Sequence, residues 1–388
     1  MKARDIVIAG YAETPSELKS GKSAYDLAGE AFSMLLESTR IAKKEIDGLS
    51  VSTAMSEGTN PFFAPYMCDG LGLSPTWLNL SGLGGGSALG GVARAVSAVR
   101  EGLCGAAVVM SADAQSTDMR AKVGGYRTEY QQPAGVNMAP TLFGLLMSRY
   151  AHKFGLKYEA LGKIAATQRS HALLNDNACA KLKKPLSIED YLQSRMVADP
   201  LRLLDSVMVC DGANALLVTS AENARRLGIK KMVYPVAYAE LTNFNGDVAS
   251  PDITVTGFSK VAPQVYQQAG LTPGEIRMFD PYDDFTIAVL MQLEDFGFCA
   301  KGEGSDYVLR TDLSYKGELP LNTSGGQLSA GQPGLAGGGL NLTEAVRQMF
   351  GEGGARQVPD PRNALITGIG VIPYGRNWSV SSAMILEA

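Results

Sequence analysis

The sequence predicts an α/β fold built from two similar halves, with a long insertion in the first half. Strand-like and helix-like segments alternate along the chain, and two passages recur in one order of elements. Residues 35–51 ("LLESTRIAKKEIDGLSV") are echoed by residues 265–281 ("VYQQAGLTPGEIRMFDP"), and residues 86–96 ("GSALGGVARAV") by residues 334–346 ("GLAGGGLNLTEAV"). The alternative is that these are chance echoes of the kind that any α/β chain can show.

The first elements follow from hydrophobic periodicity and capping signals. Residues 5–10 are a short apolar strand, and residues 106–113 ("AAVVMSAD") a second buried strand. Residues 23–39 are an amphipathic helix, because Ser23 and Asp26 have the spacing of a capping box. The residues expected on the apolar face of this helix are Leu27, Ala31, Met34 and Leu35.

The echoes divide the chain into three regions. The N-terminal half comprises residues 1–115 with 200–240, and the C-terminal half residues 241–388. Residues 116–199 interrupt the first half with a polar, glycine-bearing segment and two helices, near 141–155 and 158–178. A long insertion of this composition is typical of a lid or binding loop, so we expect it to cover a ligand.

Composition excludes several classes of partner. The formal charge is −4, only 19% of residues are charged, and no dense basic cluster occurs, which argues against nucleic acid and membrane partners. The N-terminus has no signal-peptide core and no run of 18 apolar residues occurs, so a cytoplasmic protein is expected. The five cysteines include no CxxC pair, which predicts neither a disulfide framework nor a metal site in this chain.

A glycine-rich stretch, "GLGGGSALGGV" at residues 82–92, opens a predicted helix. It contains no cysteine, histidine or acid. Glycines let the backbone approach another group closely, and free N–H groups at a helix start can stabilise negative charge. The stretch therefore predicts a backbone binding site without chemistry of its own.

Three passages resemble one family, the thiolase superfamily, and in particular its cysteine-less branch related to sterol carrier protein X. They are "ADPLRLLDSVMVCDGANALLVTS" (198–220), "YDDFTIAVLMQLEDFGFCAKGEG" (282–304) and "LPLNTSGGQLSAGQPGLAGG" (319–338). The resemblance implies a thiolase fold, in which two βαβαβαββ halves form a five-layer αβαβα sandwich. It also implies a homodimer, formed across edge strands near residues 78–111.

The sequence departs from thiolases at each catalytic position. The resemblance puts the nucleophilic cysteine at Gly85, the activating histidine at Gln332, and the residue that orients the thioester oxygen at Tyr282. The loop of the second catalytic cysteine is replaced by residues 368–375, which carry Tyr374. Glutamine cannot exchange a proton near neutral pH, so covalent catalysis by the family's route is lost.

A hydroxyl nucleophile has no evident base. Ser87 is the nearest candidate, but a serine needs an adjacent base, and His152 and His171 both lie in the inserted helices. We expect Ser87 to cap or pack the helix, and the histidines to be ordinary buried or surface residues.

The remaining groups support an enolate. Gly85, Gly86 and Gly370 are the expected thioester oxyanion donors, and the resemblance adds Ser87, Asn322 and Ser259 to the residues that bind the coenzyme A thioester. Tyr282 is the expected acid/base, provided that nearby dipoles lower its pKa. Tyr374, or Tyr126 or Tyr130 from the lid, is the second candidate. Asp283 is expected to be structural, and Asp284 to bind a polar substrate group or a loop amide.

The resemblance implies a side-chain-cleaving aldolase. Such enzymes cleave β-hydroxyacyl-CoA thioesters in lipid or aromatic side-chain degradation, together with a small partner made of a zinc ribbon and an OB-fold. Two alternatives remain: an acyltransferase or Claisen-type thiolase with a different nucleophile, such as Ser87, and a non-catalytic thiolase-like subunit.

Overall fold

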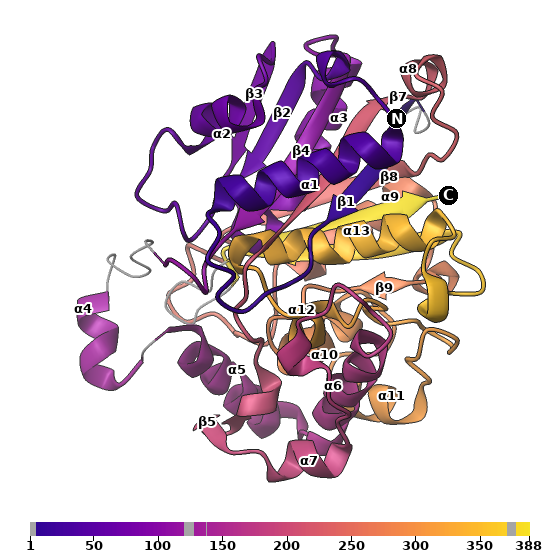
Figure 1. Cartoon of the computed structure of the whole chain (residues 1–388). Coiled ribbons are helices and arrows are strands. Elements are labelled where there is room, and N and C mark those ends of the chain that lie inside the picture. Colours follow the sequence, from indigo (N-terminus) through magenta and orange to yellow (C-terminus); the bar gives the residue numbers. More distant parts are fainter. Residues whose placement is uncertain (1–4, 120–127, 137, 371–377) are drawn as a thin grey trace.

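The computed structural model describes residues 5–119, 128–136, 138–370 and 378–388, so Tyr126 and Tyr374 lie outside the described residues (Figure 1). The strands are β1 (Ile6–Glu13), β2 (Gly48–Ser52), β3 (Trp77–Ser81), β4 (Ala106–Asp113), β5 (Met196–Ala198), β6 (Leu201–Arg202), β7 (Gly212–Ser220), β8 (Tyr234–Thr242), β9 (Phe279–Asp280), β10 (Asn363–Ile369) and β11 (Val380–Glu387). The helices are α1 (Ala24–Thr39), α2 (Phe63–Leu71), α3 (Ser87–Arg100), α4 (Thr128–Gln131), α5 (Met138–Phe154), α6 (Tyr158–Ala172), α7 (Ile188–Gln193), α8 (Ala221–Arg226), α9 (Phe258–Ala269), α10 (Thr286–Asp295), α11 (Gly304–Arg310), α12 (Gly326–Ala330) and α13 (Gly337–Met349).

Two sheets share one topology. The first has the order β1-β7-β4-β2-β3 and the second the order β8-β11-β10-β9. In each, the first three strands pair antiparallel and the fourth joins in parallel, as β2 does with β4 and β9 with β10. The short 3₁₀ turns recur as well, before β2 and β9 and before α3 and α13. The predicted repeat is therefore confirmed.

The boundary between the halves lies earlier than the sequence indicated. Strand β8 pairs with β11 from Tyr234↔Glu387 to Thr242↔Val380. Residues 234–240, which were assigned to the N-terminal half, thus belong to the second sheet. The switch is not visible in the sequence because both sheets use the same kind of buried strand.

The sheets and helices form five layers. Helices α1 and α2 cover the outer face of the first sheet, α3 and α13 lie between the sheets, and α9 with α10 covers the outer face of the second sheet (Figure 1). Successive residues of β1 alternate between layers: Val7 packs with α1, and Ile8 with α3. Strands buried on both faces are apolar throughout, as the predicted strands are. The expected sandwich is confirmed.

Helix α1 forms as predicted, with one exception on its apolar face. Ser23 and Asp26 make both hydrogen bonds of the capping box. Leu27, Ala31 and Leu35 are buried, but Met34 is 40% exposed. Met34 borders a cavity of about 440 Å³ that also touches Tyr11 and Phe350, so its side chain lies at the rim of this cavity and not in the core.

The predicted helices of the insertion are α5 and α6, and both pack on the second half. Phe143 of α5 stacks on Phe285 with ring centroids 3.9 Å apart. Lys163 of α6 donates to the carbonyl oxygens of Leu309 and Thr311. The helices after residue 138 thus support the C-terminal half. Among the described residues, no helix combines the length and apolarity that a membrane span requires.

A buried ion-pair network ties α13 to the segments around it. The Glu344 carboxylate accepts hydrogen bonds from Arg347 and Arg356 at 2.5 and 2.9 Å, and from Thr323 and Gln348. Burial opposes the charge, but the two guanidinium groups outweigh it and lower the pKa of Glu344 to about 2. One carboxylate therefore joins α13 to the segments that carry Thr323 and Arg356.

We predict that Glu344→Gln lowers the free energy of unfolding by about 3 kcal/mol, because it removes the carboxylate that pairs with the buried Arg356 and one of the two that face Arg347. Urea denaturation measures the change. The control is Glu45→Gln, which breaks an ion pair with Arg226, a side chain that is 60% exposed, and should change stability by less than about 1 kcal/mol. Equal effects of the two substitutions would contradict the prediction.

Candidate active site

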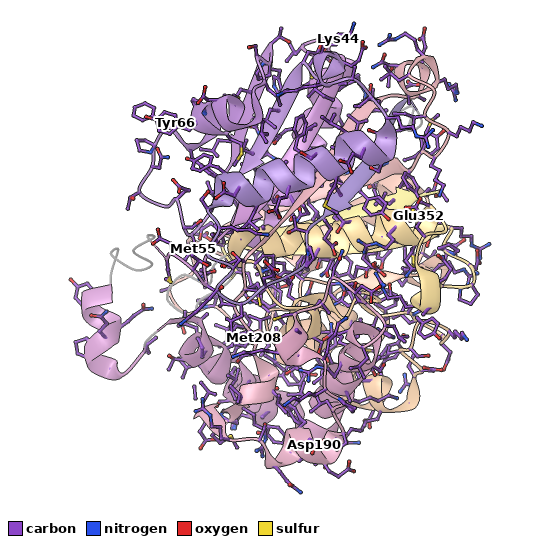
Figure 2. The ribbon with its side chains drawn as sticks, in the orientation of Figure 1. Lys44, Met55, Tyr66, Asp190, Met208 and Glu352 are labelled. Atoms are coloured by element: carbon purple, nitrogen blue, oxygen red, sulfur yellow. The ribbon has the colours of Figure 1, made fainter. Side chains whose placement is uncertain are left out.

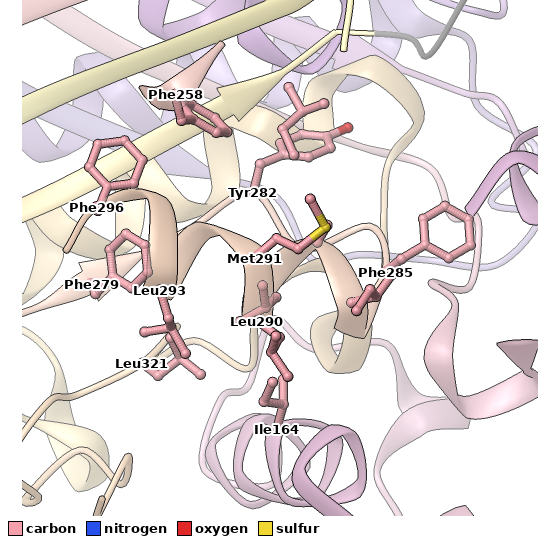
Figure 3. Close-up of a cluster of buried hydrophobic side chains, with 14 of the residues drawn as sticks. Ile164, Phe258, Phe279, Tyr282, Phe285, Leu290, Met291, Leu293, Phe296 and Leu321 are labelled. Atoms are coloured by element: carbon pink, nitrogen blue, oxygen red, sulfur yellow. The ribbon is translucent and has the colours of Figure 1, made fainter. Parts of the chain in front are cut away.

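Tyr282 lies where β9 ends, one turn before α10, and its backbone is fixed from two elements. Its N–H donates to the Thr367 hydroxyl of β10 at 2.8 Å, and its carbonyl accepts from the Gln292 side chain of α10 at 2.8 Å. The side chain is 4% exposed. Its ring joins an apolar cluster, and the hydroxyl is directed away from Phe258 and Phe296 (Figure 3). Ligand sites in proteins typically combine apolar surroundings with a few placed polar groups, and the Tyr282 hydroxyl at the edge of this cluster fits that description.

The Tyr282 ring fills the space that a side chain at position 85 would need. A β-carbon on Gly85 would lie 2.2 Å from two ring carbons of Tyr282 and 2.5 Å from its hydroxyl oxygen. A β-carbon on Gly338 of α13 would lie 2.0 Å from the Gly85 carbonyl oxygen. Position 85 is therefore a glycine because the Tyr282 ring leaves no room for a side chain, and position 338 is a glycine because the Gly85 carbonyl lies against it.

A chain of hydrogen bonds fixes the direction of donation to Tyr282. The Gln327 amide nitrogen donates to Asp283 at 3.4 Å, which leaves its oxygen to accept from Gln332 at 3.0 Å. The Gln332 nitrogen also donates to the Tyr282 hydroxyl oxygen at 3.3 Å. That oxygen accepts from the protein, so the phenolic proton is left for another acceptor.

The ionisation of Tyr282 differs from the expectation. Burial raises the pKa of the phenol well above 10, and the charges of Asp284 and Asp283 raise it further, while only the hydrogen bond from Gln332 lowers it. The condition set for Tyr282 as a base, a pKa lowered by nearby dipoles, is therefore not met. Tyr282 is protonated at neutral pH and is placed to donate a proton.

The expected oxyanion donors are only partly available. The Gly86 N–H donates to the Leu83 carbonyl at 3.1 Å, and the Gly370 N–H to the Val380 carbonyl at 2.9 Å, as part of the sheet edge. These two assignments are corrected, since neither group is a free donor. Within the described part of the chain, the Gly85 N–H has no acceptor.

The other expected residues have structural partners. The Ser87 hydroxyl is fully buried and accepts from the Leu83 N–H at 2.9 Å. The Asn322 amide donates to the Pro281 carbonyl at 3.2 Å and supports the segment below Tyr282. The Ser259 hydroxyl donates to the Thr256 carbonyl at the start of α9. These contacts give each residue a place in the fold, and no hydrogen bond among the described residues joins Ser87 or Ser259 to Tyr282.

The two aspartates after Tyr282 differ in their surroundings. Asp283 accepts from the backbone of Gln327 and Leu328 and from Gln168 and Asn341, in agreement with the structural role expected for it. Asp284 is half-buried, and its Oδ1 atom is buried without a hydrogen-bond partner. Burial and the charge of Asp283 raise the pKa of Asp284 to about 8. The roles of Asp283 and Gln327 in holding Gln332 were not predicted, because they depend on distant segments meeting.

His171 is structural and His152 is at the surface. The fully buried His171 accepts the Tyr315 N–H at Nε2, at 3.0 Å, so its Nδ1 carries the proton and donates to the Asn322 carbonyl at 3.2 Å. His152 is exposed on α5, and Tyr130 on α4 is 75% exposed. Neither histidine can activate Ser87. The described residues include no group of three or more acidic, cysteine or histidine side chains placed to hold a metal ion.

Comparisons with known proteins place the chain in a family. The Thiolase C-terminal domain-like family matches residues 240–387. The chain is 32% identical to a "Steroid side-chain-cleaving aldolase" of Thermomonospora curvata, over 95% of this chain and 96% of that protein. It is also 32% identical to a "17-hydroxy-3-oxo-4-pregnene-20-carboxyl-CoA lyase" of Mycobacterium tuberculosis, over 90% and 93% of the two chains.

A solved structure supports the same relationship. The "Ltp2-ChsH2(DUF35) aldolase" structure superposes with a TM-score of 0.85 at 30% identity, covering 99% of this chain and 98% of that one. The two chains therefore share one fold over nearly their whole length.

We predict that Gly85→Ala destabilises the protein by about 1–3 kcal/mol, because the new β-carbon overlaps the Tyr282 ring. In the double variant with Tyr282→Ala the two effects should not add, because removing the ring relieves the overlap. Thermal and urea unfolding measure both. Gly29→Ala is the control: the space beside Gly29 on α1 is open, so a small gain of roughly 0.5–1 kcal/mol is expected. Strict additivity would refute the overlap.

We also predict that His171 makes the protein acid-sensitive. Burial lowers the pKa of His171 to about 4, below its ordinary value, so the unfolded chain binds more protons between about pH 6.5 and pH 4. Its contribution to stability is complete above about pH 6.5 and falls by up to about 3 kcal/mol as the pH drops through this window. Urea titrations of wild type and His171→Gln across the window test this; parallel pH profiles would rule it out.

Proposed function

The chain belongs to the thiolase superfamily, in the branch that contains the steroid side-chain-cleaving aldolases, and we propose that it is a carbon–carbon lyase. The proposed reaction is the retro-aldol cleavage, or in reverse the formation, of a β-hydroxyacyl-CoA thioester through an enolate. The observation that carries the proposal is the contact between Tyr282 and Gly85: a proton donor occupies the place where a covalent nucleophile would stand. The names of the aldolase and CoA-lyase relatives support it.

Tyr282 is proposed to protonate the enolate carbon. Cleavage of the bond between the α- and β-carbons leaves an electron pair on the thioester enolate, and the α-carbon must then take up a proton. A protonated phenol whose oxygen already accepts from Gln332 has its proton free for this step. The donation from Gln332 also stabilises the phenolate that results.

The start of α3 is proposed to stabilise the enolate oxygen. The Gly85 N–H has no acceptor in the described part of the chain, and the helix dipole places partial positive charge at the same end. The 3₁₀ turn at Gly84–Gly86 therefore offers a donor without any nucleophilic atom. This is the combination that enolate chemistry requires.

The acyltransferase alternative has less support. An acyl-enzyme needs a nucleophile, and the Ser87 hydroxyl is fully buried and committed to Leu83. Neither histidine lies in hydrogen-bond contact with it. A thiolate at position 85 would require Tyr282 to leave its place.

Two partners are part of the proposal. A second copy of the chain would pair along β3, the edge strand of the first sheet, where Leu78 and Leu80 are 41% and 44% exposed. A small zinc-ribbon and OB-fold protein would complete the enzyme. The DUF35 component of the similar aldolase structure supports a partner of this kind.

We predict that Tyr282→Phe lowers kcat for cleavage by about 10²–10⁴-fold, because it removes the proton donor and keeps the ring that packs on Gly85. The full chain, alone and with a zinc-ribbon and OB-fold partner, is mixed with 17-hydroxy-3-oxo-4-pregnene-20-carboxyl-CoA or 3-hydroxy-3-phenylpropanoyl-CoA. Release of the ketone or aldehyde is followed by chromatography.

The control is Tyr266→Phe, which removes a half-buried hydroxyl from α9 that donates to the Phe296 carbonyl. This variant should keep wild-type rates. Wild-type cleavage rates for Tyr282→Phe would contradict the proposed role of Tyr282 as proton donor. An acyl adduct on the protein, detected by mass spectrometry, would favour acyl transfer instead.

A further inference from the structure

We propose that Asp284 is a second catalytic residue, the base that takes the proton of the substrate's β-hydroxyl group. The inference rests on the proposed aldol function and deepens it. A protonated Tyr282 can serve as the acid of a retro-aldol reaction but not as its base. The base must therefore come from another residue near Tyr282.

The short segment between β9 and α10 assigns different tasks to its two aspartates. The Asp283 carboxylate is held by two backbone N–H groups, of Gln327 and Leu328, and by side-chain amides from α6, α12 and α13. It is fully buried, and its hydrogen-bonding capacity is used. Asp284 makes no ion pair among the described residues, and its Oδ1 atom is buried without a partner.

The segment at residues 206–210 connects Asp284 to the hydrogen-bond chain of Tyr282. The Val207 N–H donates to the Asp284 carbonyl at 3.2 Å, and the carbonyl of the next residue, Met208, accepts the Gln332 N–H at 2.9 Å. The Cys210 N–H then donates to the Gln332 carbonyl at 2.7 Å. Residues 206–210 thus run past Asp284 and Gln332 in turn, with Met208 near the middle of the view in Figure 2.

Residues 206–209 are partly exposed to solvent, although the residues around them are buried. Asp284 and Gln332 are both partly exposed, as are residues 206–209, whereas Tyr282, Asp283 and Phe285 are buried. The carboxylate of Asp284 and the amide of Gln332 therefore belong to the partly solvent-accessible part of this region. A substrate β-hydroxyl group placed against Asp284 would supply the hydrogen bond that its buried Oδ1 atom lacks.

The environment also suits a base. Burial and the neighbouring Asp283 charge raise the pKa of Asp284 to about 8, which is far closer to neutrality than an ordinary carboxylate. A general base is most effective when its pKa lies near the working pH.

The proton balance closes with these two residues. The Asp284 carboxylate takes the β-hydroxyl proton, the carbon–oxygen double bond forms, and the bond between the α- and β-carbons breaks. Its electron pair passes to the thioester enolate, whose α-carbon takes the proton of Tyr282. The proton on Asp284 then returns the phenolate to phenol, and both residues regain their starting states.

The test combines an isosteric variant with chemical rescue. Asp284→Asn should lower kcat for cleavage of 17-hydroxy-3-oxo-4-pregnene-20-carboxyl-CoA or 3-hydroxy-3-phenylpropanoyl-CoA by about 10²–10³-fold, without loss of thermal stability. Asp284→Ala should be equally slow, and added formate, which can enter the space of the lost carboxylate, should restore part of its rate. Asp176→Asn, on a side chain that is 111% exposed, is the matched control and should match wild type.

Each failure has a separate meaning. If wild type cleaves neither thioester, the proposed function fails. If wild type cleaves and Asp284→Asn retains more than half of its rate, only the role of Asp284 is overturned. A slow Asp284→Ala variant that formate does not rescue also overturns it, because a purely structural carboxylate would behave in this way.

Discussion

The packing of one aromatic ring on one glycine is the constraint on which the site depends. Tyr282 fills the space beside Gly85, and Gly338 of α13 lies against the Gly85 carbonyl oxygen. Any side chain at position 85 would have to displace the tyrosine, so the packing excludes a nucleophile there. The same contact fixes the phenol over the start of α3, where backbone donors and the helix dipole stabilise negative charge.

Asp283 fixes the direction of the hydrogen bonds that reach Tyr282, as Gly85 fixes the space around its ring. It is a buried carboxylate that forms no ion pair with the residues that the structure describes, and amides from three helices satisfy it. Because Gln327 donates to Asp283, it must accept from Gln332, and Gln332 must donate to Tyr282. A residue that never touches the phenol therefore decides that its oxygen accepts from the protein and that its proton points elsewhere.

The sequence was informative wherever the signal is local or repeated. The capping box of α1, the strand at residues 106–113 and the two echoing halves all follow from patterns that a few neighbouring residues carry. Motif positions also brought Gly85, Tyr282 and Gln332 to one site. The boundary at β8, the exposed Met34 and the occupied N–H groups of Gly86 and Gly370 were missed, because each depends on which distant segment lies alongside. The ionisation of Tyr282 was missed for the same reason. Burial raises its pKa, and how deeply the side chain is buried can be known only from the packing of distant segments.

Burial then sets both halves of the proposed proton transfer. Removing water raises the pKa of a phenol and of a carboxyl group alike, since both lose the hydration of their anions. For Tyr282 the rise keeps the proton on the oxygen and preserves an acid. For Asp284 the same effect brings the pKa of the carboxyl group close to neutral pH and makes the carboxylate a stronger base. An acid and a base of opposite roles can therefore arise two residues apart from one physical cause, without histidine or cysteine, once the fold has taken this segment out of water.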